Sequence, residues 1–182
     1  MLSSAHHNDV LLHQGIGLDG FNAMPDRKAV HALYECCNSV ALAADLAKGR
    51  PYDDHDALFR RADALLFALP EAAVDHILDA YPHIGTRPRS TKSQAEQCSV
   101  WDDDPAVMAE LSDAARRYTE HFGYRFVMCV GGLCATDVLT AIADRLHHEV
   151  ETERKVVRNE LARINRTRLE RMLGPEGGYQ NW

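Results

Sequence analysis

The chain has 182 residues, of which 46% are hydrophobic and 26% are charged, the balance of an ordinary globular domain. This composition excludes wholesale disorder, a collagen-like repeat and a disulfide-dense miniprotein. A net charge of −7 argues against general nucleic-acid binding, because contacts to phosphate need a surplus of Lys and Arg. The longest apolar stretch, 126–135, is far shorter than the roughly 20 residues that span a bilayer, and the polar start of the chain does not resemble a secretory signal. We therefore expect a cytoplasmic protein with neither membrane nor nucleic-acid partners.

The first half of the chain shows helical periodicity interrupted by Pro and Gly. The first 20 residues have little periodicity and are expected to form a loose N-terminal arm. Apolar residues at three- and four-residue spacing predict one helix over 26–47, a second over 54–66 and a third over 70–80. The stretch 81–92 contains two prolines and a glycine and is predicted to be a loop.

The second half is helical by the same criterion. A Ser-x-x-Glu capping box at Ser93 predicts a short helix, and Pro105 opens a longer one. Two further patterns predict helices over 135–148 and 151–173. The apolar segment 127–130 is compatible with either a buried strand or a helix start.

Six or more predicted helices, with no convincing pair of strands, indicate an all-α fold. We expect a single-domain helical bundle over residues 21–173, preceded by the arm at 1–20 and followed by a tail at 174–182.

The five cysteines are an odd number and lie mostly in apolar runs, so we expect reduced, buried thiols. Cys36 and Cys37 are adjacent and lack the C-x-x-C spacing of a zinc site, which favours core packing.

Two other segments are weak candidates for a site. His147, His148, Glu151 and Glu153 could form a metal cluster, because His147 and Glu151 share a helix face, but a solvated helix end is the preferred interpretation. The pair Gly131–Gly132 lacks the third glycine of a dinucleotide loop and is interpreted as a tight turn. We predict no metal and no cofactor.

A stronger candidate is the region that follows residue 80. It brings a histidine (His83), a hydroxyl (Ser93), a carboxylate (Glu96) and an amide (Gln97) to a loop and a predicted helix start. Free backbone amides and the positive end of a helix favour anionic ligands there. The alternative is a helix cap whose polar groups face solvent.

Seven segments in order resemble the family of 2-oxo-4-hydroxy-4-carboxy-5-ureidoimidazoline (OHCU) decarboxylases, which complete the route from urate to (S)-allantoin. They are Phe21-Asn22 with Pro25, Glu35-Cys36-Cys37-Asn38-Ser39, Arg50-Pro51-Tyr52, Ser93-x-x-Glu96-Gln97, Tyr118 with Phe122-Gly123-Tyr124-x-Phe126, Arg145-Leu146, and Glu153-Arg154 through Leu161, Ile164, Arg168 and Leu169. The resemblance covers most of the chain, from about residue 21 to residue 173.

The resemblance implies an all-helical, cofactor-free homodimer that decarboxylates a small anionic substrate. In the family, a His-Pro pair supplies the catalytic histidine, and the Ser-x-x-Glu-Gln segment and the backbone after Phe-Gly hold the substrate. It therefore implies catalytic roles in this chain for Tyr81, His83 and Glu96. The implied substrate-binding residues are Pro82, Ser93, Gln97, Val127, Met128, Cys129, Val130 and Gly131, with Arg168 contacting the anion.

This chain departs from the family at the catalytic position, because Tyr81 stands before Pro82 and a histidine, His83, occurs two residues later. Leu133 also stands where bacterial relatives often carry arginine, and His147-His148 replaces a Gly-Asn turn. Histidine titrates near neutrality, whereas tyrosine, with a reference pKa of about 10, is a poor base. Because Pro82 restricts the backbone, we expect Tyr81 to face the pocket and His83 not to. A shifted turn would instead bring His83 to that place.

Three functions therefore remain open. The first is OHCU decarboxylation with His83 or Tyr81 in the place of the family histidine, and it ranks first. The second is a divergent paralogue that acts on another small anionic N-heterocyclic or keto-acid substrate in specialised metabolism. The third is a non-catalytic binding protein, against which the intact Glu96 and Gln97 argue.

Overall fold

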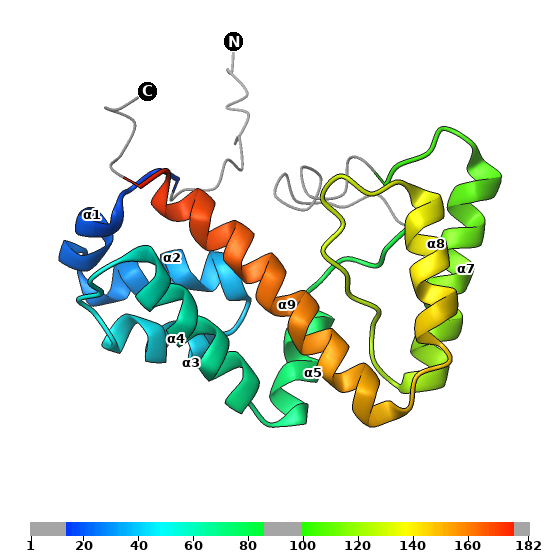
Figure 1. Cartoon of the computed structure of the whole chain (residues 1–182), viewed down its shortest axis with the longest axis horizontal. Helices are drawn as coiled ribbons and strands as arrows, with labels where there is room; N and C mark the ends of the chain where they lie inside the picture. The colour runs from blue at the N-terminus through cyan, green and yellow to red at the C-terminus, as the bar shows by residue number, and fades with distance from the viewer. Residues whose placement is uncertain (1–13, 86–99, 177–182) are drawn as a thin grey trace, which may run out of the picture.

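The computed structural model describes residues 14–85 and 100–176, and within these residues the chain forms helices and no strand (Figure 1). In chain order the helices are α1 (Leu18–Ala23), α2 (Asp26–Cys37), α3 (Val40–Lys48), α4 (His55–Ala68), α5 (Glu71–Asp79), α7 (Pro105–Phe122), α8 (Ala135–Arg145) and α9 (Val150–Leu173). The predicted all-α fold is confirmed. None of these helices combines the length and the apolar character that a membrane span requires.

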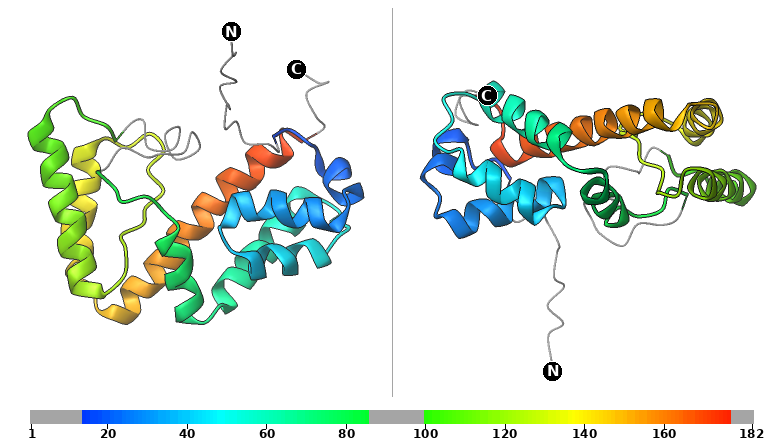
Figure 2. Two further views of the ribbon diagram at one scale, coloured as in Figure 1. Left: turned by 180° about the vertical axis from the view of Figure 1, so that it is seen from behind. Right: turned by 90° about the horizontal axis from the view of Figure 1, so that it is seen from below.

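Helix α9 runs diagonally from the end that holds α1 towards the end that holds α7 and α8 (Figures 1 and 2). Its C-terminal half packs against α2 and α4, and α3 packs against both of those helices. Its N-terminal end lies beside the paired helices α7 and α8. Between the two ends, Arg158 of α9 donates to the carbonyl of Leu66 and to Glu71, which fixes α9 to the junction of α4 and α5.

The predicted helix over 26–47 is wrong in one respect, because it is two helices with a break at Asn38. This residue has φ 54° and ψ 25°, the left-handed conformation that Asn tolerates better than most residues, and it ends α2. Ser39 then caps α3 by accepting a hydrogen bond from the Leu42 N–H at 3.3 Å. Apolar spacing continues through the break, which is why periodicity alone predicts one helix.

The end of the predicted N-terminal arm is an ordered part of the fold. The backbone N–H groups of residues 15–17 donate to the carbonyls of residues 171–173 at 2.8–3.0 Å, and α1 begins at Leu18. These bonds satisfy carbonyls in the last turn of α9 that have no partner within the helix. Residues 15–17 therefore pair with the end of α9, and residues 18–20 belong to α1, rather than to a loose arm.

A buried polar cluster joins α7, α8 and the start of α9. Glu153 is fully buried and accepts hydrogen bonds from the Tyr118 hydroxyl and, at 2.7 Å, from Arg145 Nε. Its second oxygen lies 2.7 Å from His148 Nδ1. Burial and the hydrogen bond to Glu153 raise the pKa of Tyr118 far above its ordinary value, so this phenol stays protonated. The interpretation as a solvated helix end is wrong for Glu153, although His147 is exposed as expected.

Four of the cysteines lie in the described part of the chain, and none of these four is in a disulfide. Cys36 and Cys37 are buried, as predicted, and Cys129 is partly buried. Cys134 is exposed, because it occupies the N-cap of α8, where its sulfur lies 3.0 Å from a carboxylate oxygen of Asp137.

Candidate functional site

The Tyr81 side chain is held inside the molecule directly after α5. Its N–H donates to the Leu78 carbonyl at 3.1 Å, which extends the last turn of the helix. Arg125 Nη1 donates to the carbonyls of Asp79 and Tyr81 at 2.9 and 2.8 Å and so fixes the backbone on both sides of residue 80. Only 8% of Tyr81 is exposed. The backbone therefore determines where the ring lies.

Arg168 of α9 meets Tyr81 in this interior. Its Nη1 donates to the Tyr81 hydroxyl and to the Cys36 carbonyl, both at 3.2 Å. The guanidinium carbon lies 5.0 Å from the centroid of the tyrosine ring, within the range of a cation–π interaction. Arg168 is 3% exposed. A cation is thus fixed in a largely water-excluded place, where its interaction with an anion is much stronger than in water.

His83 lies on the other side of the same loop and faces α7. It is exposed and lines a pocket of about 460 Å³ together with Ser112, Ala115 and Thr119. Gly85 holds the loop there, since its φ is 82° and a Cβ on it would come within 2.9 Å of the Ser112 nitrogen. Pro82, between the two side chains, is partly buried. The structure therefore has Tyr81, and not His83, beside Arg168.

The predicted substrate-binding segment 127–131 is neither a strand nor a helix start: residues 127–130 have no regular secondary structure, and Gly131 lies in a turn. Side chains satisfy its backbone in place of a strand partner: Arg145 Nη1 donates to the Val127 carbonyl at 2.8 Å, and the Cys129 N–H donates to Glu160 Oε2 at 2.7 Å. Val127 and Val130 are buried, Met128 and Cys129 are partly buried, and Gly131 is exposed. The bond to Glu160 holds this segment against α9. Glu160 lies eight residues before Arg168, which is about 12 Å along the helix axis.

Three predicted residues, Ser93, Glu96 and Gln97, lie outside the described residues. Within residues 14–85 and 100–176, no group of three or more His, Cys, Asp or Glu side chains could hold a metal ion.

One buried polar residue of this region, Asn165, was not predicted. It is 4% exposed and lies one helical turn before Arg168 on α9. A sequence signal exists, since Leu161, Asn165 and Arg168 follow the four- and three-residue spacing of a buried stripe, and a polar residue in such a stripe is unusual.

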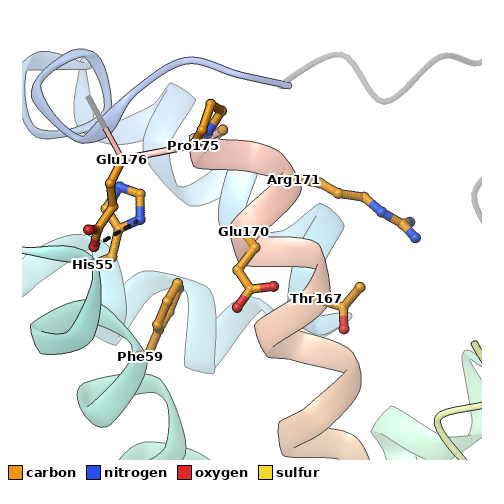
Figure 3. A pocket seen from close by; sticks show the side chains of 8 residues that line it. His55, Phe59, Thr167, Glu170, Arg171, Pro175 and Glu176 are labelled. Atoms are coloured by element: carbon orange, nitrogen blue, oxygen red, sulfur yellow. Dashed lines mark ion pairs between the residues drawn. The ribbon is translucent and has the colours of Figure 1, made fainter. Parts of the chain in front are cut away.

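A larger pocket, of about 630 Å³, lies between the start of α4 and the end of α9 (Figure 3). His55 and Phe59 line one side of it, and Thr167 and Glu170 line the other. The ring of His55 lies 3.9 Å from a carboxylate oxygen of Glu176. No residue predicted for the functional site lines this pocket.

Comparison with known proteins identifies one family. The family model for OHCU decarboxylase matches residues 22–170 of the chain. The chain is 32% identical over 107 residues to 2-oxo-4-hydroxy-4-carboxy-5-ureidoimidazoline decarboxylase of Halalkalicoccus jeotgali, which covers 57% of this chain and 61% of that protein. It is 25% identical over 163 residues to the uric acid degradation bifunctional protein of Bacillus sp. (strain TB-90), which covers 86% of this chain and 32% of that protein.

The match spans about a third of the length of the Bacillus protein and about three fifths of the length of the Halalkalicoccus protein.

The fold has a counterpart among solved structures. A crystal structure of OHCU decarboxylase in the presence of (S)-allantoin superposes with a TM-score of 0.70 at 20% identity, over 82% of this chain and 99% of that chain.

Proposed function

The chain belongs to the OHCU decarboxylase family, and on that premise we propose that it is a carboxy-lyase of urate degradation that acts on OHCU. The observation that carries this proposal is the buried Arg168, fixed by the Tyr81 hydroxyl and the Cys36 carbonyl. A decarboxylase must hold its substrate carboxylate in one orientation, and a guanidinium grips a carboxylate through two parallel hydrogen bonds. We assign this role to Arg168.

The reaction needs no electron sink from outside the substrate. When the bond between the ring carbon and the carboxylate breaks, CO2 leaves and the electron pair passes into the adjacent C=N of the ring. A proton then adds to one face of the ring carbon at the other end of that system. The protein must desolvate the carboxylate, orient it out of the ring plane and deliver the proton. We therefore propose cofactor-independent chemistry.

Tyr81 takes the position of the family histidine in this proposal, and it is the residue we expect to contact the substrate beside Arg168. Its hydroxyl can donate a hydrogen bond or a proton to the substrate. His83 is excluded from this role in our proposal, because it faces α7 from the opposite side of the loop. Glu96 and Gln97 complete the site on the strength of the family resemblance, together with Ser93, Pro82 and the segment 127–131.

A second candidate follows from the same tyrosine. A phenol in the place of an imidazole changes both the shape of the site and the group that can give or take a proton there. This observation favours a paralogue whose substrate keeps the carboxylate that Arg168 binds but differs from OHCU in the group that meets residue 81. Such a substrate is a small anionic N-heterocycle or keto acid.

The deciding experiment follows freshly generated OHCU by circular dichroism, with and without the protein. The signal of (S)-allantoin should develop faster with the protein, and Arg168→Lys should reduce this acceleration. A wild-type protein that leaves the spontaneous decay of OHCU unchanged would exclude OHCU as its substrate and favour the second candidate.

We also propose that the protein is a homodimer, on the family resemblance alone. Sedimentation at micromolar concentration should then show a species of twice the 20.4 kDa chain mass. A species of the single-chain mass alone contradicts this proposal.

A further inference from the structure

Asn165 carries a buried hydrogen-bond acceptor that the protein itself does not use. Its Oδ1 is inaccessible to solvent and accepts no hydrogen bond within the described part of the chain. Burying an amide oxygen without a donor is unfavourable, and most such groups in folded proteins have a partner. A ligand that donates a hydrogen bond to Asn165 would remove this cost.

Helical geometry places this acceptor at the proposed site. Residues three apart leave a helix on the same side, with Cβ atoms about 5–6 Å apart, so Asn165 and Arg168 share one face of α9. That face is buried at both residues, with 4% and 3% exposure. Arg168 in turn contacts the Tyr81 hydroxyl. A second polar group on a molecule whose carboxylate binds Arg168 would therefore come within reach of Asn165.

The proposed substrate has a group that matches this acceptor. Its name states that it carries a carboxylate and a ureido group on a small ring. A urea presents N–H donors beside a carbonyl, which is complementary to the acceptor and donor of a carboxamide side chain. We propose that Asn165 accepts a hydrogen bond from a ureido N–H of the substrate and selects ureido compounds over analogues without that group.

This inference rests on the proposed function for the identity of the substrate, but its test does not need turnover. (S)-Allantoin carries a ureido group on a hydantoin ring, and hydantoin itself lacks that group. Calorimetric titration with both compounds compares the wild type, Asn165→Leu and Tyr124→Phe. Asn165→Leu removes the acceptor at similar volume. Tyr124→Phe is the matched control, because its hydroxyl is also buried without a hydrogen-bond partner among the described residues and lies outside the proposed site.

We expect Asn165→Leu to weaken the binding of allantoin about tenfold and to leave that of hydantoin unchanged, since one buried hydrogen bond is lost. The melting temperature should be equal or higher, because the substitution removes an unsatisfied polar group. Tyr124→Phe should bind both compounds as the wild type does. If Asn165→Leu does not fold, Asn165→Ala makes the same comparison.

Equal affinity of wild type and Asn165→Leu for allantoin overturns the inference, and so does an equal loss for both compounds or a wild type that binds neither. The proposed activity fails separately. A wild type that does not decarboxylate OHCU but shows the ureido-dependent difference refutes the activity and supports the contact. Normal OHCU turnover with the same KM in the wild type and in Asn165→Leu supports the activity and refutes the contact.

Discussion

The Tyr81 hydroxyl accepts a hydrogen bond from Arg168 Nη1 at 3.2 Å, although the two residues are 87 positions apart in the chain. The contact joins the loop after α5 to the last third of α9. It also brings together a cation suited to a carboxylate and a phenol at the position where the family resemblance implies the proton-handling residue.

Arg168→Lys should raise the KM for OHCU about 10- to 100-fold, the effect of losing one or two charge-assisted hydrogen bonds. A lysine ammonium cannot reproduce the planar fork of a guanidinium. The melting temperature should also fall, because Arg168 donates to the Cys36 carbonyl. Arg166→Lys is the control, since Arg166 is half-exposed and lies 3.9 Å from Asp63. If both variants raise KM equally, Arg168 has no special role.

Tyr81→His should increase OHCU decarboxylation about 100-fold, the effect of a general acid that titrates near neutral pH. His83→Ala should leave the wild-type rate unchanged, because His83 faces α7. Steady-state kinetics of both variants test this pair. Robust wild-type turnover that His83→Ala abolishes would show that His83 reaches the substrate during the reaction.

Glu96→Gln should lower kcat for OHCU about 100-fold with little change in melting temperature, because the substitution keeps the shape and removes the charge. This prediction rests on the family resemblance, since Glu96 lies outside the described residues. Glu110→Gln provides the control, because Glu110 is an exposed carboxylate on α7. Unchanged kcat with a lower melting temperature in Glu96→Gln would favour a helix-capping role over a catalytic one.

Glu153→Gln should destabilise the protein by about 3–5 kcal/mol, because it leaves the buried Arg145 guanidinium without its counter-charge. Urea unfolding followed by circular dichroism measures this change. The matched control on the same helix is Glu151→Gln, whose side chain is 85% exposed and pairs with Lys155 at the surface, and it should leave the urea midpoint nearly unchanged. Similar losses in the two variants would mean that the cluster does not hold α7, α8 and α9 together.

The helices could be predicted from the sequence because their signals are local. Asp104 and Pro105 begin α7 and Gly123 ends it, as their residue types indicate. The break between α2 and α3 was missed because it depends on one residue, Asn38, in the left-handed conformation. The segment 127–130 was ambiguous because it has no regular secondary structure, and side chains from α8 and α9 satisfy its backbone.

The site was harder to predict because its contacts are not local. The resemblance singled out Tyr81 and Arg168 separately, but no periodicity indicates that they touch. Glu153 was interpreted as a solvated residue because its own helix end is polar, and only Arg145 and Tyr118 on other helices explain its burial. Asn165 was not predicted because it belongs to none of the motifs that carry the family resemblance. Its lack of a hydrogen bond is visible only in the three-dimensional structure.

The orientation of the loop after α5 has an evolutionary consequence. Tyr81 faces Arg168 and His83 faces α7, so the two side chains reach different parts of the molecule. An imidazole beside Arg168 therefore requires a substitution at position 81 itself. The two tyrosine codons differ from the two histidine codons only in their first base, so a T-to-C transition converts Tyr to His and a C-to-T transition converts it back. The chemistry beside Arg168 is thus one point mutation away from its alternative, and selection can reverse it without rebuilding the fold.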